Sequence, residues 1–271
     1  MYKRQDQQKI LRYPNDSYDV GSYYKGEHLN DIWGLTTIGI AKSQEEMDAH
    51  LAKVDQSSVG TNWGVGDIMY ADLDGDGKIS NGTNKLGDTG DYRIIGNSTP
   101  RFKYGITLDA AWKGFDFSIF MQGIGKRDLW LDGCYFWGAN GQGNEWQSTG
   151  FAEHWDFFRP EGDPLGANLN SYYPRVNFSG DRNTKVQTRY LQNGAYLRLK
   201  NVQLGYTLPR VWTEKAGISS VRVYVSGDNL ATITSLSKIF DPEATGSLAG
   251  TGSGKLYPLQ RVISVGVNVN F

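Results

Sequence analysis

The sequence is poor in the residues that build disulfides, metal centres and most catalytic sites. It has one cysteine, Cys134, and three histidines, His28, His50 and His154, in 271 residues. A lone cysteine allows no internal disulfide and fits no metal or redox spacing. The sequence contains no HExxH or Walker A motif, and Gly252-Ser253-Gly254 does not have the pattern of a nucleophile elbow. We therefore expect no enzymatic activity, and a hydrolase using Glu153, His154 and Asp156 is the least favoured alternative.

Long apolar runs, a charge excess and a secretion signal are also missing. No segment approaches the ~20 apolar residues of a transmembrane helix, and a formal net charge of -1 argues against nucleic acid as a partner. The basic N-terminus is not followed by an apolar stretch and cleavage site. We expect residues 1–22 to be a ragged remnant rather than a natural start, and residues 23–271 to carry the fold.

Residues 261–271 show a strict alternation of apolar and polar side chains. Ile263, Val265, Val267, Val269 and Phe271 alternate with Ser264, Gly266, Asn268 and Asn270. This period of two predicts a strand with one apolar and one polar face. An edge strand ending on an aromatic residue is an aggregation hazard unless it is paired. Closing a barrel removes the edge, and closure is obligatory in lipid.

The segment 101–121 predicts a hairpin with the same alternation. Phe102, Tyr104, Ile106, Leu108, Ala110 and Trp112 share one face, whereas Arg101, Lys103, Thr107 and Asp109 share the other. Lys113-Gly114 fits a tight turn, after which Phe115, Phe117, Ile119 and Met121 resume the pattern.

Further elements are predicted on both sides of this hairpin. Residues 32–41 read as a strand, Ser43 to Glu46 as a capping box, and Met47, Leu51 and Val54 as the apolar side of a short helix. Residues 196–208 form a strand whose apolar phase slips between Leu199 and Val202, which predicts a β-bulge. Val221, Val223 and Val225 mark the next strand.

The connections between these strands alternate in length. They are long at 42–97, 125–194 and 235–258, and short at 113–114 and 209–217. Bacterial outer-membrane barrels have short periplasmic turns and longer external loops. We predict an all-β fold: an antiparallel transmembrane barrel with long extracellular loops and one short surface helix. Because Arg or Lys facing lipid at mid-bilayer costs about 2–4 kcal/mol, Arg101, Lys103, Arg198 and Lys200 are expected to face the lumen.

Two loop motifs are candidate sites. Asp72, Asp74, Asp76 and the backbone carbonyl of Lys78 match the start of a calcium loop, but Thr83 replaces the bidentate carboxylate at the twelfth position. Asp88 or Asp91 could substitute, and an acidic turn without metal is the alternative. In the long loop, Trp137, Trp146 and Trp155 are candidates for stacking on a sugar or peptide. The alternative is that these rings pack the loop against the barrel.

Five segments together resemble a known family. They are 66–77 (GDIMYADLDGDG), 95–102 (IGNSTPRF), 114–123 (GFDFSIFMQG), 196–206 (YLRLKNVQLGY) and 222–230 (RVYVSGDNL). In this order they resemble the C-terminal region of SusC/RagA-type TonB-linked outer-membrane transporters of Bacteroidetes.

The resemblance implies a barrel of about 22 strands, of which this chain would hold the final third without the plug and TonB-contacting segments. Such a part would not transport alone. It also implies uptake of oligosaccharides or peptides with a SusD-like surface lipoprotein and the TonB complex, in the outer membrane of a Gram-negative cell. Phe271 resembles the signal read by the barrel-assembly machinery. The competing interpretation is a secreted, calcium-stabilised, carbohydrate-binding β-sandwich.

Overall fold

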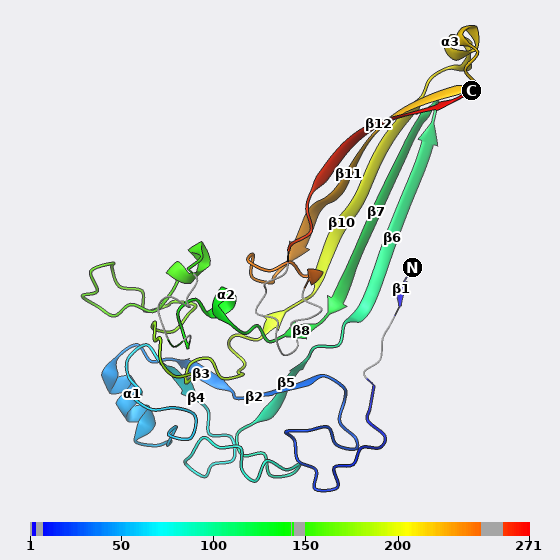
Figure 1. The fold of residues 1–271 in the computed structure, drawn as a ribbon. Helices are drawn as coiled ribbons and strands as arrows, with labels where there is room; N and C mark the ends of the chain where they lie inside the picture. Colours follow the sequence, from blue (N-terminus) through cyan, green and yellow to red (C-terminus); the bar gives the residue numbers. More distant parts are fainter. Residues whose placement is uncertain (1, 4–7, 142, 144–149, 245–256) are drawn as a thin grey trace.

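The computed structural model describes residues 2–3, 8–141, 143, 150–244 and 257–271. They form a long sheet with a loop-rich body at one end (Figure 1). The strands are β1 (Tyr2–Lys3), β2 (Asp31–Gly34), β3 (Thr37–Ile40), β4 (Ile68–Tyr70), β5 (Arg93–Asn97), β6 (Arg101–Trp112), β7 (Phe115–Lys126), β8 (Asp128–Leu129), β9 (Gln192–Asn193), β10 (Tyr196–Thr207), β11 (Ser220–Thr234) and β12 (Val262–Asn270). The α-helices are α1 (Gln44–Leu51), α2 (Cys134–Trp137) and α3 (Arg210–Thr213), and the 3-10 helices are η2 (Ala152–Trp155) and η3 (Glu214–Ala216).

The main sheet has six antiparallel strands in the order β1-β6-β7-β10-β11-β12. The predicted all-β class is confirmed, because the few helices are short and lie in connections. Within the described residues the sheet is open and forms no closed barrel. Among those same residues, no helix combines the length and apolar character needed to cross a bilayer.

The strand register aligns the apolar faces of neighbouring strands. Side chains of directly paired residues in an antiparallel sheet point to the same face. Three of the resulting rows are Trp112–Phe115–Tyr206–Val223–Val267, Ala110–Phe117–Leu204–Val225–Val265 and Leu108–Ile119–Val202–Gly227–Ile263. This apolar face is open: Trp112 is 69% exposed, Ile263 70% and Val265 76%. The predicted period-two surface therefore exists and continues from β6 to β12.

The opposite face of the main sheet is polar. One row there is Asp109–Ser118–Gln203–Ser226–Ser264. The Nε of Arg222 donates to Asp116 Oδ1 at 2.8 Å, and its guanidinium lies 4.9 Å from the Tyr224 ring. Gly205 and Gly266 leave the space that these long side chains occupy. The sheet thus separates a continuous apolar surface from one bearing charge and hydrogen-bonding groups.

A bulge keeps β10 in phase with this two-sided pattern. Lys200 is an extra residue relative to β7, because Leu199 and Asn201 pair with residues that are adjacent in β7. The pairing with β11 shifts at the same place, but there β11 carries the extra residue. Asn229 on β11 adopts a positive φ of 52° at the same level. The predicted bulge is confirmed: it allows Leu199 and Val202 to share the apolar face although three positions separate them.

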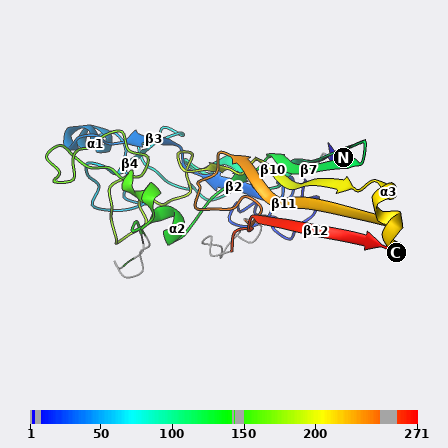
Figure 2. The ribbon, with the colours of Figure 1, turned by 90° about the horizontal axis from the view of Figure 1, so that it is seen from above.

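The connections divide the molecule into two ends. The turn at Lys113 and Gly114 has φ values of 47° and 86°, as a tight hairpin turn requires, and α3 with η3 forms the other short connection. Both lie at the end where β12 finishes (Figures 1 and 2). The long connections gather at the opposite end and build the loop module, defined as the described residues of 8–100, 127–195 and 235–244. The predicted alternation of loop lengths is confirmed.

The loop module has its own core. Its fully buried side chains include Leu35, Ile68, Tyr70, Phe136, Trp137 and Tyr190. The carboxylate of Asp67, which is 0% exposed, accepts hydrogen bonds from Arg175 and Asn183 and so joins residues more than a hundred positions apart. The apolar core of the described chain therefore lies in the loops and not against the main sheet.

Two local predictions in the loop module have different outcomes. The helix α1 begins as predicted: Ser43 Oγ accepts from the Glu46 amide at 3.2 Å, and Met47 is buried. The single strand predicted at 32–41 is wrong. Leu35 interrupts it, because its amide donates to Val186 O, and the two halves pair separately, β2 with β5 and β3 with β4.

Gly123 provides a test of the sheet geometry. An added Cβ there would collide with the carbonyl oxygen of Tyr196 and would lie 2.5 Å from the Tyr104 hydroxyl, which donates to that same carbonyl at 3.1 Å. We expect Gly123→Ala to lower the free energy of unfolding by about 1–3 kcal/mol through overpacking. Thermal unfolding of the purified protein measures the change. Gly39→Ala is the matched control, because its Cβ would meet nothing within 4 Å; equal losses from both substitutions would contradict the packing described.

Candidate substrate-binding cavity

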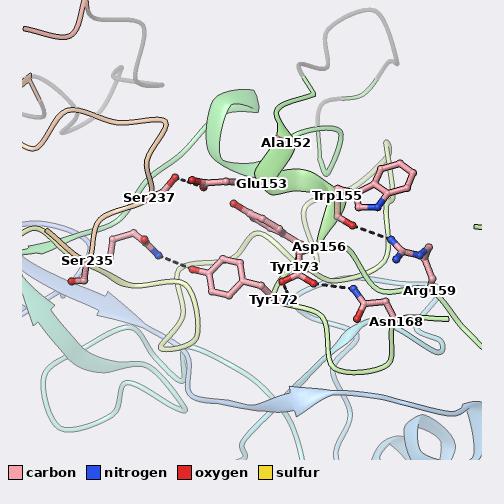
Figure 3. Close-up of a pocket in the computed structure, with 11 residues that line it drawn as sticks. Ala152, Glu153, Trp155, Asp156, Arg159, Asn168, Tyr172, Tyr173, Ser235 and Ser237 are labelled. Atoms are coloured by element: carbon pink, nitrogen blue, oxygen red, sulfur yellow. Dashed lines mark hydrogen bonds between the residues drawn. The ribbon is translucent and has the colours of Figure 1, made fainter. Parts of the chain in front are cut away.

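A cavity of ≈ 550 Å³ opens in the loop module beside η2 (Figure 3). One wall comes from η2 and the turn that follows it, and the facing wall comes from Ser235 and Ser237, directly after β11. The other lining residues are Ala152, Glu153, Trp155, Asp156, Arg159, Asn168, Tyr172, Tyr173 and Gln192. The lining combines aromatic rings, amides, hydroxyls and carboxylates, which is the chemistry of sites for polar organic ligands.

Trp155 presents the exposed aromatic surface of this cavity. Its side chain is 60% exposed, and the Arg159 guanidinium lies 5.4 Å from its ring and 4.9 Å from that of Phe157. Arg159 itself is 8% exposed and donates to the carbonyls of Gly166 and Trp155 at 2.7 and 2.9 Å. A buried cation held in this way orients the indole, more than half of which stays exposed to a ligand.

The two carboxylates in the lining already have partners. Glu153 accepts from Ser237 Oγ at 2.6 Å and from the Lys238 amide at 2.9 Å. Asp156 accepts from Asn168 Nδ2 at 2.8 Å and from the Tyr172 amide at 3.2 Å. These bonds fix the positions of both carboxylates while leaving lone pairs that a ligand hydroxyl or ammonium group can use.

The tyrosines beside them are neutral at physiological pH. Burial, followed by the influence of neighbouring groups that include Glu153, raises the pKa of the Tyr173 hydroxyl. Burial also raises the pKa of Tyr172, whose hydroxyl accepts from Gln192 Nε2 at 2.9 Å. Both phenols therefore remain available as proton donors in hydrogen bonds.

His154 does not complete an acid–base group with Glu153 and Asp156. Its Nδ1 accepts from the Phe151 amide, and its Nε2 contacts Phe136 O, each at 3.1 Å. Both ring nitrogens therefore hold the backbone around η2. Since general acid–base catalysis requires a group that can reach a substrate proton, this geometry gives the hydrolase alternative no support.

The three candidate tryptophans have different surroundings. Trp137 is 2% exposed, donates from Nε1 to Leu131 O and packs against Tyr190 with ring centroids 4.7 Å apart. It belongs to the loop-module core. Trp146 lies outside the described residues. Trp155 is therefore the candidate that the cavity presents to a ligand.

The acidic motif folds into a turn that gathers carboxylates. Ligand oxygens of Asp72, Asp74 and Asp91 lie within 4.8 Å of one another. Asp91 is fully buried and accepts from the amides of Leu73 and Ser80. Of the two substitutes that the sequence offered for the missing ligand, Asp91 therefore turns toward the motif, whereas Asp88 accepts from Thr83. Asp76 lies outside this group of three, and its carboxylate accepts from the Lys78 amide at 2.8 Å.

The four basic residues that were predicted to face a lumen lie in two different environments. Lys103 is exposed on the polar face of the main sheet, in a row with Ile124 and Tyr196. Arg198 and Lys200 lie on the same face and form ion pairs with Asp241 and Glu243.

Arg101, by contrast, stands at the junction with the loop module and lines a cavity of ≈ 350 Å³ with His28 and Asp128. The next residue, Phe102, has a positive φ of 54°, so the regular alternation of β6 begins only after it. Sequence reasoning did not identify Asp241 and Glu243. The only signal for them was the spacing of two acids around Pro242 in a loop.

The chain is similar in sequence to known proteins. No protein-family model matches the chain. It is 33% identical over 216 residues to "TonB-dependent receptor P3" of Formosa agariphila, covering 76% of this chain and 19% of that receptor. It is 30% identical over 256 residues to "TonB-dependent receptor P26" of the same organism, covering 91% of this chain and 23% of the receptor.

Solved structures show the same fold. The RagAB peptide importer in the 'open-open' state matches with a TM-score of 0.59 at 21% identity, over 96% of this chain and 24% of that one. The RagAB peptide transporter matches with a TM-score of 0.58 at 23% identity over the same shares. The chain thus spans about a fifth to a quarter of the length of these proteins. All four are named as receptors, transporters or importers. The chain therefore belongs to the TonB-dependent receptors and shares the fold of the RagAB structures.

Proposed function

We propose that this chain supplies barrel wall and external loops to an outer-membrane transporter that is powered through TonB. The cargo is an oligosaccharide or a peptide, captured together with a SusD-like surface lipoprotein. The names of the curated relatives support the TonB coupling, and the RagAB structures, named as a peptide importer, support uptake by this fold. In this arrangement the loop module faces the exterior, the short turns face the periplasm, and Phe271 serves as the assembly signal.

The exposed apolar face of the main sheet carries this proposal. On β11 that face runs from Val221 to Ile233, about 40 Å along the strand at ~3.3 Å per residue. With a tilt of roughly 35–45° it spans about 30 Å, enough for the ~25 Å apolar band of an outer-membrane barrel. A soluble protein rarely leaves such a surface open. In lipid, the polar face bearing Lys103, Arg198 and Lys200 then lines the lumen.

The β-sandwich alternative requires a second sheet over the apolar face. In the part of the chain that the structure describes, the only other sheets are two-stranded and belong to the loop module or its junction with the main sheet. Ile263 and Val265 remain 70% and 76% exposed. The observed face therefore favours contact with hydrocarbon.

A pair of adjacent substitutions on β12 tests the lipid contact. Ile263 lies in a central apolar row, and Ser264 faces the opposite side. We expect Ile263→Arg to destabilise the inserted receptor by about 2–4 kcal/mol and to lower its amount in the outer membrane. Ser264→Arg should leave that amount near the wild-type value. Immunoblots of outer-membrane fractions measure the amount of receptor. Equal losses from the two substitutions would contradict contact between the apolar face and lipid.

Uptake and the role of Trp155 can be tested together in the native bacterium. Growth of a gene-deletion strain is compared with wild type on single oligosaccharides and peptides as sole carbon source. At least one source should require the gene. For that source, Trp155→Ala should slow growth at low concentration, because one stacking ring is worth about 0.5–1.5 kcal/mol. Trp212→Ala is the matched control: Trp212 is 66% exposed on α3, at the far end of the sheet.

This experiment can contradict the uptake proposal and the role of Trp155 independently. If no source on the panel depends on the gene, the uptake proposal is wrong. If one source does depend on it and Trp155→Ala grows like wild type, uptake stands and the cavity is not its contact site.

We also propose that the turn containing Asp72 and Asp74 binds a structural Ca²⁺ with Asp91 as the additional carboxylate. The Asp76 amide lowers the pKa of Asp74, but burial and the neighbouring charges of Asp76, Asp91 and Asp72 outweigh it and raise that pKa. This mutual repulsion is the kind that a bound divalent cation relieves.

Calcium should therefore raise the thermal unfolding temperature of the receptor relative to EDTA. Asp74→Asn should remove that difference. Asp163→Asn, which alters a comparable turn carboxylate that accepts from the Leu165 amide elsewhere in the loop module, should retain it. Identical unfolding temperatures of the wild type in calcium and in EDTA would contradict the calcium site.

A further inference from the structure

The segment 235–244 is the part of the loop module that follows β11, and it ties the module to the main sheet. Its apolar side chains belong to the module: Leu236 and Phe240 are 3% and 6% exposed, and the Phe240 ring lies 6.4 Å from that of Phe136. Its start is fixed at the end of β11, because Thr234 Oγ1 accepts from the Leu236 amide at 3.2 Å and donates to the carbonyl of Ala195, the residue before β10, at 2.8 Å. We call this segment the brace.

The brace forms one wall of the cavity at Trp155. Ser237 Oγ and the Lys238 amide bind the two oxygens of Glu153 at 2.6 and 2.9 Å. Figure 3 shows the Ser237–Glu153 bond at the side of the cavity opposite Trp155 and Arg159. The width of the cavity therefore depends on where the brace is held.

Ion pairs hold the other end of the brace to β10. Arg198 Nη2 lies 2.8 Å from Asp241 Oδ1, and Arg198 Nη1 lies 3.1 Å from Glu243 Oε2. Lys200 Nζ reaches the same Glu243 oxygen at 2.9 Å. Gln122 Nε2 donates to Glu243 Oε1 at 2.9 Å. The side chains of Arg198, Asp241 and Glu243 are only 5%, 6% and 12% exposed. Removing one partner from a cluster this deeply buried lowers the stability strongly, because the remaining charges stay buried without compensation.

These ion pairs persist at neutral and mildly acidic pH. Burial alone would raise the pKa of Asp241 and Glu243, but hydrogen bonds and the charges of Arg198 and Lys200 outweigh it and lower both pKa values. A lowered carboxylate pKa gives stability that is present above the unfolded-state value of about 4 and is lost only as the pH falls through the folded value. The charged and titratable groups facing the two carboxylates are Arg198, Lys200 and Tyr196. The contact is thus a constant support rather than a pH switch.

We propose that Arg198 and Lys200 are positioning residues for the cavity at Trp155. Through Asp241 and Glu243 they fix the brace, and through the brace they fix Ser237 and Glu153. The bulge at Lys200 contributes to this arrangement. It lets the side chains of Arg198 and Lys200 both reach Glu243, while the apolar face of β10 continues before and after the bulge. This inference rests on the proposed function only in taking the cavity as the ligand site.

Hydrogen exchange measured by mass spectrometry on the full-length receptor in detergent tests the inference without any cargo. Arg198→Met alone leaves buried carboxylates unpaired and could prevent folding, so the principal variant also carries Asp241→Asn and Glu243→Gln. We expect exchange in the brace and in residues 152–156 to become about tenfold faster. Lys200→Met should produce a smaller increase, because Lys200 is 22% exposed and Arg198 still holds Glu243.

Two further variants separate positioning from general stability. Arg198→Lys keeps the charge and should restore most of the protection. Arg222→Met with Asp116→Asn neutralises another ion pair on the same face of the sheet, near the short turns, and should leave exchange in the brace unchanged. Wild-type protection of the brace in the triple variant would overturn the proposal, as would an equal increase in the Arg222 control. Because the readout needs no ligand, a failed uptake experiment would not produce either result.

Discussion

The register of the main sheet is the constraint on which the rest of the structure depends. Each strand alternates between apolar and polar side chains, and the pairing brings apolar residues opposite apolar residues from β6 to β12. A shift of one residue in any pair would place Val or Ile on the charged side. The extra residue at Lys200 keeps β10 in register with β7, and an extra residue in β11 at the same level keeps β11 in register with β10. An apolar surface this continuous and this exposed requires an apolar environment. The proposed position in the wall of a membrane barrel supplies one.

The loop module is stabilised in a different way from the main sheet. Its strands are short, and its backbone hydrogen bonds are scattered over many turns, so it relies on a buried aromatic core and on polar hubs such as Asp67. It must nevertheless be held in a fixed position on a sheet that has no core of its own. The brace provides this link: its Leu236 and Phe240 pack in the module core, and its Asp241 and Glu243 form ion pairs with β10. The proposed binding residue Trp155, which a loop carries, would thereby be supported by a rigid scaffold.

Local patterns predicted well what local physics determines. The period of two, the Lys113-Gly114 turn, the Ser43 cap and the bulge at Lys200 each follow from a few neighbouring residues. Features that depend on distant partners escaped prediction. The strand expected at 32–41 breaks because Leu35 pairs with Val186, and Trp137 is buried because Tyr190 covers it. The partners of Arg198 and Lys200 lie 43 residues further along the chain, so nothing near either residue indicated an ion pair.

The environment of the two faces of β12 can be measured directly by spin-label scanning of residues 262–270 in the reconstituted receptor. Collision rates with oxygen, which concentrates in hydrocarbon, are compared with those of a water-soluble nickel complex. If the apolar face contacts lipid, oxygen should dominate at Ile263, Val265, Val267 and Val269, and nickel at Ser264, Gly266 and Asn268. Equal accessibility along the strand, or nickel dominating at the valines, would contradict the account.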